Sequence, residues 1–139
     1  MLRIVVALLA LVICGPALAE DLGASDRQAI TTVISDQLAA FRKGDAERAF
    51  SLASPGIQAK FGTPAVFLEM VRSGYAPVYT ARRASFRSLT VEDGVPVQAV
   101  ELRDENGEGV LALYFMEHEP DGSWKINGCV LAKLRELSA

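Results

Sequence analysis

The sequence contains few of the histidine and cysteine residues that metal sites and disulfide frameworks require. Its 139 residues include one histidine and two cysteines, which cannot supply the four ligands of a structural zinc site. Glycine-rich phosphate-binding loops and nucleophile elbows are also absent from the sequence. No motif in the sequence identifies a catalytic residue. We therefore expect neither a bound metal ion nor a cofactor.

The chain also lacks an excess of basic residues. Lysine and arginine number 14 against 17 aspartates and glutamates, which gives a formal net charge of −3. Proteins that bind nucleic acid present a basic patch or stripe. The charge balance therefore excludes a general nucleic-acid partner, although a local anion site stays open.

The N-terminal residues have the layout of a secretory signal peptide. Arg3 precedes an apolar run over residues 4–13, and Ala17 and Ala19 stand at the −3 and −1 positions before Glu20. This pattern predicts cleavage after Ala19, and the apolar run is too short to anchor the chain in a bilayer. We expect a signal peptide over residues 1–19 and a single domain over residues 20–139, periplasmic or secreted, with no membrane anchor after cleavage.

Cleavage would remove Cys14 and leave Cys129 as the one cysteine. No intrachain disulfide could then form. A buried, inert thiol is one interpretation, because free cysteine is among the most buried residue types. An intermolecular bridge or a reactive thiol is the other.

Three N-terminal helices are predicted, over residues 25–42, 45–53 and 65–73. Ser25 and Gln28 have the spacing of a capping box. Asp45 can cap the second helix, and Thr63-Pro64 supplies a cap and a first-turn proline for the third. Residues 57–61 are expected to form a short turn.

Alternating segments follow the helices, at residues 79–92, 95–104, 109–119 and 123–134. Asn106-Gly107 and Asp121-Gly122 are typical of two-residue hairpin turns. Helices followed by an antiparallel meander predict an α+β domain, with three helices packed on a curved four-stranded antiparallel sheet.

Two-residue turns would fix the register of the last three strands. Leu102 would pair with Leu111, and Tyr114 with Cys129. The face under the helices would then carry Val100, Leu102, Leu111, Leu113, Phe115, Trp124, Ile126 and Val130. The opposite face of the sheet would also be largely apolar. An exposed apolar face usually marks an interface, so we expect this face to form a homodimer. Its interface residues would be Val97, Ala99, Tyr114, Met116, Cys129 and Leu131.

Two sets of residues carry a resemblance to known families. Gly44-Asp45-Ala46 at the second helix and the closing Asp121-Gly122-Ser123-Trp124-Lys125-Ile126 resemble the nuclear-transport-factor-2-like superfamily, which includes SnoaL-like cyclases. A second pattern is similar to an uncharacterised family of exported bacterial proteins, a domain of unknown function. That pattern consists of Phe67, Met70-Val71-Arg72, Tyr75, Pro77-Val78-Tyr79, Gln98, Tyr114 and Asp121-Gly122…Trp124…Gly128-Cys129.

The superfamily resemblance implies a cone-shaped roll with a cavity between the helices and the concave sheet. The polar residues expected at that cavity are Gln37, Tyr75, Tyr79, Gln98, Glu117 and Trp124. Gln37 and Gln98 have a second interpretation, in which they hydrogen-bond backbone groups. The leading hypothesis is a non-catalytic exported binding module, a homodimer that holds a small apolar ligand.

Two alternatives belong to other classes of protein. An isomerase-, cyclase- or dehydratase-like enzyme would use a buried carboxylate, and Glu117 is the candidate. A structural subunit of an envelope complex would need no cavity at all.

Overall fold

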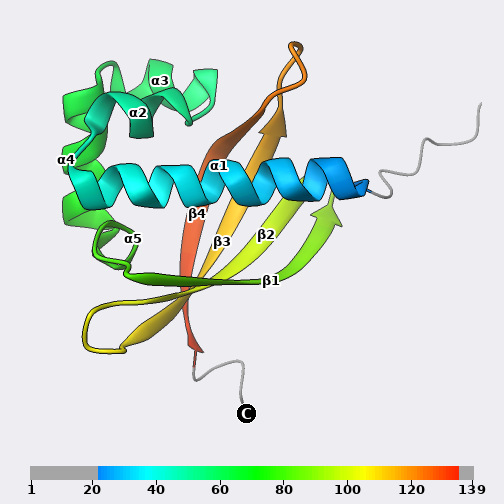
Figure 1. Cartoon of the computed structure of the whole chain (residues 1–139). Coiled ribbons are helices and arrows are strands. Elements are labelled where there is room, and N and C mark those ends of the chain that lie inside the picture. Colours follow the sequence, from blue (N-terminus) through cyan, green and yellow to red (C-terminus); the bar gives the residue numbers. More distant parts are fainter. Residues whose placement is uncertain (1–21, 135–139) are drawn as a thin grey trace, which may run out of the picture.

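Within the described part of the chain, the helices precede the strands (Figure 1). The computed structural model describes residues 22–134, so the predicted signal peptide lies outside the described residues. The helices are α1 (Ala24–Lys43), α2 (Ala46–Ser51), α3 (Pro55–Phe61), α4 (Pro64–Gly74) and α5 (Ala76–Tyr79). The strands are β1 (Arg83–Glu92), β2 (Val95–Arg103), β3 (Gly109–His118) and β4 (Trp124–Lys133). No helix in this described part is long and apolar enough to cross a membrane.

Several predicted helix ends are confirmed. Gly44 ends α1 in the left-handed conformation, with φ 67°, which glycine adopts without steric cost. The Asp45 side chain caps α2 by accepting from the Arg48 backbone N–H at 3.1 Å. Thr63 caps α4 by accepting from the Val66 N–H at 3.2 Å.

The helix count differs from the prediction, because the described residues form five helices rather than three. Residues 55–61 form α3 where a turn was expected, and α5 precedes the sheet. Ser54 caps α3, and Pro55 occupies its first turn, where the missing N–H costs nothing. The predicted capping box at Ser25 is wrong: Ser25 lies inside α1, which starts after Gly23 without a side-chain cap.

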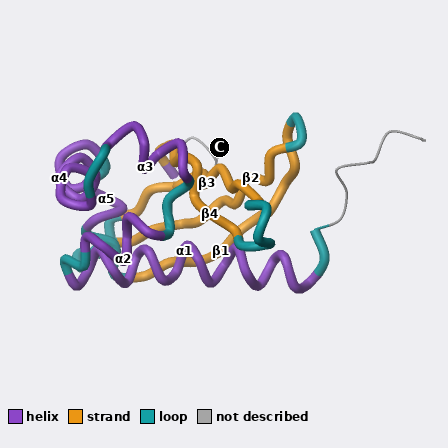
Figure 2. Tube along the Cα trace, turned by 90° about the horizontal axis from the view of Figure 1, so that it is seen from above, coloured by secondary structure: helices purple, strands orange, loops and turns teal. Residues whose placement is uncertain are grey.

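The strands form one open antiparallel sheet in the order β1-β2-β3-β4, which confirms the α+β class and the meander. Seen from above, α1 runs along one side of the sheet and α4 stands at one end (Figure 2). Ile30, Ile34 and Phe41 of α1 are at most 1% exposed and belong to the core. The helices therefore cover one face of the sheet.

The predicted register between β2 and β3 is wrong by one residue. Leu102 pairs with Val110, and Leu111 pairs with Glu101. Asp104 closes a loop over residues 104–108, because its side chain accepts from the backbone N–H groups of Asn106 and Glu108. A shift of one residue moves every side chain to the other face, so β3 is inverted relative to the prediction.

The predicted pairs in the middle of β3 and β4 are correct. Tyr114 pairs with Cys129, and Leu113 with Val130. Nearer the hairpin, a bulge at Asn127 leaves Met116 opposite Ile126. Trp124 and Ile126 therefore point to the same side as Cys129, rather than to the side of Val130.

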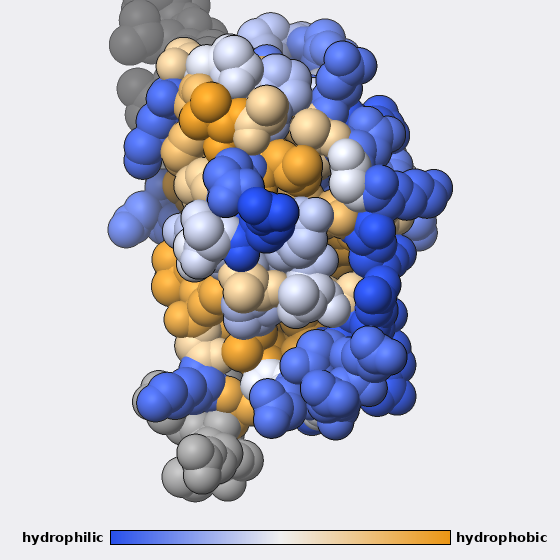
Figure 3. Space-filling model, turned by 90° about the vertical axis from the view of Figure 1, so that its left-hand side faces the viewer, coloured by the Kyte–Doolittle hydropathy of each residue, from blue (hydrophilic) through white to orange (hydrophobic). Residues whose placement is uncertain are grey.

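These changes correct the two faces of the sheet. Four residues predicted at the dimer interface lie on the helix-covered face, namely Tyr114, Met116, Cys129 and Leu131. The open face retains Val97 and Ala99 and gains four residues predicted to be inside, Leu111, Leu113, Phe115 and Val130. Seen from the helical end, hydrophilic residues dominate the side of α1, and hydrophobic residues reach the surface on the other side (Figure 3).

Candidate ligand-binding cavity

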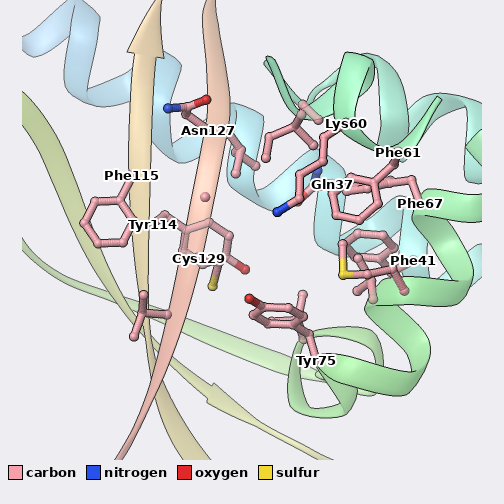
Figure 4. A pocket seen from close by; sticks show the side chains of 18 residues that line it. Gln37, Phe41, Lys60, Phe61, Phe67, Tyr75, Tyr114, Phe115, Asn127 and Cys129 are labelled. Carbon is pink, nitrogen blue, oxygen red and sulfur yellow. The ribbon is translucent and has the colours of Figure 1, made fainter. Parts of the chain in front are cut away.

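A cavity of about 310 Å³ lies between β4 and the helices α3, α4 and α5, with α1 behind it (Figure 4). This volume is at the lower end of the range for small-molecule sites. Because β4 is an edge strand, no further strand closes this side of the sheet. The cavity therefore has the size and position to admit a small molecule.

Aromatic rings form the helical wall of the cavity. The Phe67 ring lies at the centre of this cluster, with centroid distances of 6.0 Å to Phe41, 5.6 Å to Phe50 and 5.9 Å to Phe61. All three ring pairs are tilted, which is a favourable aromatic arrangement. Of these rings, Phe41, Phe61 and Phe67 line the cavity and give it an apolar wall that favours an apolar ligand.

Hydrogen bonds fix α3 against the bulge of β4. The Ser54 hydroxyl donates to Asn127 Oδ1 at 2.7 Å and accepts from the Ile57 N–H at 3.2 Å. The backbone N–H of Ser54 donates to the Ile126 carbonyl at 2.8 Å. Ser54 is fully buried, where such bonds are costly to lose. The distance between the helical wall and the strand is therefore set by bonds at the bulge.

Three polar groups from different elements point into one region of the cavity. Figure 4 shows the Tyr114 hydroxyl from β3, the Cys129 sulfur from β4 and the Tyr75 hydroxyl from the end of α4 directed toward one another. Tyr114 is 1% exposed, and its Oη has no hydrogen-bond partner within residues 22–134. A buried polar atom without a partner is rare in proteins. We call this group the Tyr114–Cys129–Tyr75 cluster.

Burial keeps Tyr114 and Cys129 of this cluster uncharged. Desolvation raises the pKa of the Tyr114 hydroxyl well above its usual value, and the neighbouring Cys129 adds to this effect. Desolvation also raises the pKa of the Cys129 thiol to about 12. Both groups therefore keep their protons at neutral pH and act as neutral hydrogen-bond donors.

The charged side chain of the described cavity lining is a cation, Lys60. Lys60 of α3 is exposed and extends over the cavity, with its Nζ 5.4 Å from the Phe61 ring centroid. In the described part of the chain, no aspartate or glutamate lines the cavity. A general base of the carboxylate type is therefore absent from this lining.

Two of the six predicted site residues line the cavity, Gln37 and Tyr75. Gln37 is 4% exposed and donates from Nε2 to the Ala49 carbonyl at 3.1 Å. This bond ties α1 to α2, so Gln37 serves the packing of the wall as well as lining it. The ligand-binding role of both residues stays a prediction.

Two other predicted residues are outside the cavity lining and have structural partners. Tyr79 lies in α5 and packs on Phe41, with ring centroids 6.2 Å apart. Gln98 donates from Nε2 to the backbone carbonyls of Arg87 and Ala99, at 3.0 and 2.9 Å. Arg87 belongs to the irregular part of β1, where the pairing with β2 is interrupted. Gln98 therefore hydrogen-bonds backbone carbonyl groups, which is the second of the two interpretations given for this residue.

Trp124 and Glu117 also lie away from the cavity. The Trp124 indole donates to Asp26 at 3.3 Å and stacks on His118 at 4.4 Å. Glu117 is next to the tip of the β3–β4 hairpin, and alternation along β3 places it on the open face rather than the inner one. There the neighbouring Glu117 carboxylate raises the pKa of Glu119.

Sequence reasoning missed the cavity role of Tyr114, Cys129, Lys60 and Phe61. Tyr114 and Cys129 were predicted opposite each other, as they are, but on the other face. Lys60 and Phe61 belong to α3, and the signal for that helix is Ser54 followed by proline. The described residues contain no cluster of three or more potential metal ligands.

Replacing Tyr114 by phenylalanine should stabilise the ligand-free protein by about 1 kcal/mol. The substitution removes only the buried hydroxyl, whose unmet hydrogen bond costs about 1–3 kcal/mol. Urea unfolding monitored by circular dichroism measures the change. Tyr79→Phe is the control, and we expect a change within about 0.5 kcal/mol there. A loss of stability in Tyr114→Phe would instead mean that Oη has a partner in the protein.

Comparison with known proteins assigns the chain to a family without assigning an activity. A search of curated proteins found no match to the chain. One family model, described as "Domain of unknown function (DUF4864)", matches residues 23–139 and so covers every helix and strand described above. The chain therefore belongs to the DUF4864 family.

Proposed function

We propose that this chain is an exported, non-catalytic binding module that holds a small apolar ligand and acts as a homodimer. The observation that carries the proposal is the cavity of about 310 Å³ between the aromatic helical wall and β4. Ligand pockets are typically apolar clefts with a few polar groups that orient the ligand. This cavity has both features.

The arrangement of elements supports a place in the nuclear-transport-factor-2-like superfamily. A long first helix, short following helices and an antiparallel meander occur here in the order that the resemblance implies. The proposed cone-shaped roll has its mouth between α4 and β4. Export is proposed from the sequence pattern of residues 1–19.

Binding is favoured over the two alternatives. The enzyme hypothesis needs a carboxylate in the cavity, and the described lining has none. The Cys129 thiol, with its pKa raised to about 12, is also a poor nucleophile at neutral pH. A structural subunit would have no need of an aromatic cavity.

The proposed dimer uses the open face of the sheet, with a corrected set of residues. Its accessible apolar residues are Leu111, Leu113, Phe115 and Val130, while Val97 and Ala99 on the same face are already buried within the protomer, at 6% and 8% exposed. Charges of both signs border this apolar centre: Glu101 forms ion pairs with Arg87 and Arg103 on one side, and Glu117 stands opposite Lys125 in the strand register on the other. An isologous dimer brings the same patch together twice. A patch with an apolar centre and a rim of both charges can complement a second copy of itself.

Native mass spectrometry of protein purified from an exporting host tests the ligand directly. We expect a dimer mass that carries a small-molecule increment, and the increment should disappear on denaturation. Cys129→Phe places a ring in the cavity and should abolish the increment. Val66→Phe adds the same ring at an exposed site on α4 and should keep it. A monomer of apo mass, unchanged by Cys129→Phe, would contradict the proposal.

A further inference from the structure

The most informative unexplained group in the molecule is the Tyr114 hydroxyl. It is buried and has no partner within residues 22–134, while the other buried hydroxyl, that of Ser54, has two. The Tyr114 side chain reaches the cavity, so a molecule inside the cavity can supply the missing partner. A bound molecule that accepts this hydrogen bond would remove the cost of leaving the hydroxyl unpaired.

From this geometry we infer that the cavity selects an apolar molecule carrying an uncharged oxygen acceptor, such as a ketone or an ester, which accepts a hydrogen bond from Tyr114 Oη. The inference rests on the proposed function and adds the chemical class of the ligand. Cys129 and Tyr75 stand beside the same region (Figure 4). All three groups can donate a hydrogen, so their natural complement is an acceptor.

The acceptor is uncharged because the cluster contains no cation. Burying a carboxylate without a paired positive charge is strongly unfavourable. Lys60 is the cation of the described lining; Figure 4 shows its side chain extending from α3 into the cavity, and its ammonium group makes no hydrogen bond to Tyr114 Oη. Lys60 is also exposed, so water screens its charge. An anionic ligand would therefore bind at Lys60 and leave Tyr114 unpaired.

Three probes with one carbon skeleton separate these possibilities. Butyrophenone carries a ketone, 4-phenylbutanoate carries a carboxylate, and butylbenzene carries no oxygen. Dissociation constants are measured by ligand-observed NMR. We expect the wild-type protein to bind butyrophenone about tenfold more tightly than butylbenzene, the ratio expected for one buried hydrogen bond.

Matched variants assign this preference to one atom. In Tyr114→Phe the two uncharged probes should bind within about twofold of each other, because the donor is gone. Tyr79→Phe removes a tyrosine hydroxyl outside the lining and should preserve the tenfold ratio. If Tyr114→Phe fails to fold, the wild-type ratio and the Tyr79 control still test the inference.

Three other results would contradict the inference, and they can be told apart. Equal binding of butyrophenone and butylbenzene to the wild type would overturn the acceptor inference and leave the proposed apolar site standing. Tightest binding of 4-phenylbutanoate, lost in Lys60→Gln, would show that the cavity selects an anion at its rim and would also overturn the inference. Failure of all three probes to bind would overturn the proposed function together with it.

Discussion

Cys129 should react with iodoacetamide at pH 8 about a thousandfold more slowly in the folded chain than in the urea-unfolded chain, once Cys14 is replaced by serine. Burial raises the pKa of the Cys129 thiol from 9.0 to about 12. The thiolate is the reacting form, and its fraction falls about tenfold for each unit by which the pKa rises above the pH. The shift therefore accounts for a factor of about a thousand.

The pH dependence separates this cause from steric shielding. Raised pKa predicts that the folded-state rate climbs about tenfold per pH unit up to about pH 11, while the unfolded-state rate levels off above about pH 9. Shielding would lower the rate equally at every pH. Since Cys129 lines the cavity, a small reagent has a path to it. A folded-state plateau near pH 9 would refute the prediction.

This test also separates two explanations of the lone cysteine. The sequence allowed a buried thiol or a thiol available for an intermolecular bridge. In the structure the sulfur faces the cavity on the helix-covered side of β4, away from the proposed dimer face. A slow, pKa-limited reaction would identify an inert thiol that is covered by the helices of its own chain.

Helix ends could be predicted from the sequence because a cap depends on few adjacent residues. Gly44, Asp45 and Thr63 each act where the sequence predicts. Helix α3 escaped prediction because Pro55-Gly56 suggests a break. The break is a helix start, since a proline in the first turn loses no hydrogen bond and Ser54 caps that turn.

Strand register could not be predicted in the same way, because side chains alternate with a period of two and one extra residue exchanges the faces. Asn106-Gly107 suggests a two-residue turn, but the bonds of Asp104 enclose it in a longer loop. At the next hairpin the turn also spans more residues, and the bulge at Asn127 shifts the register back. The pair Tyr114 and Cys129 was therefore predicted correctly and assigned to the wrong face.

Because Val130 lies on the open face of the sheet in the corrected assignment, it is the residue that tests the proposed dimer. Val130→Asp should raise the dissociation constant of the proposed homodimer by at least about a hundredfold. Val130 is 50% exposed and also borders the cavity, and its exposure means that the substitution should cost the folded protomer little. In the dimer the carboxylate would be buried without a partner, which costs about 3–5 kcal/mol, and symmetry places it in the interface twice. Sedimentation velocity over a range of concentrations measures the constant.

Val66→Asp provides a closely matched control. Val66 is 52% exposed, nearly the same as Val130, but lies in the first turn of α4 rather than on the open sheet face. An acidic residue in a first helical turn is favourable, so this variant should fold and remain dimeric. A wild-type chain that sediments as a monomer, or a Val130→Asp variant that dimerises as well as Val66→Asp, would refute the interface. In either case the open face would need another occupant, and the cavity would be the site of a monomeric binding protein.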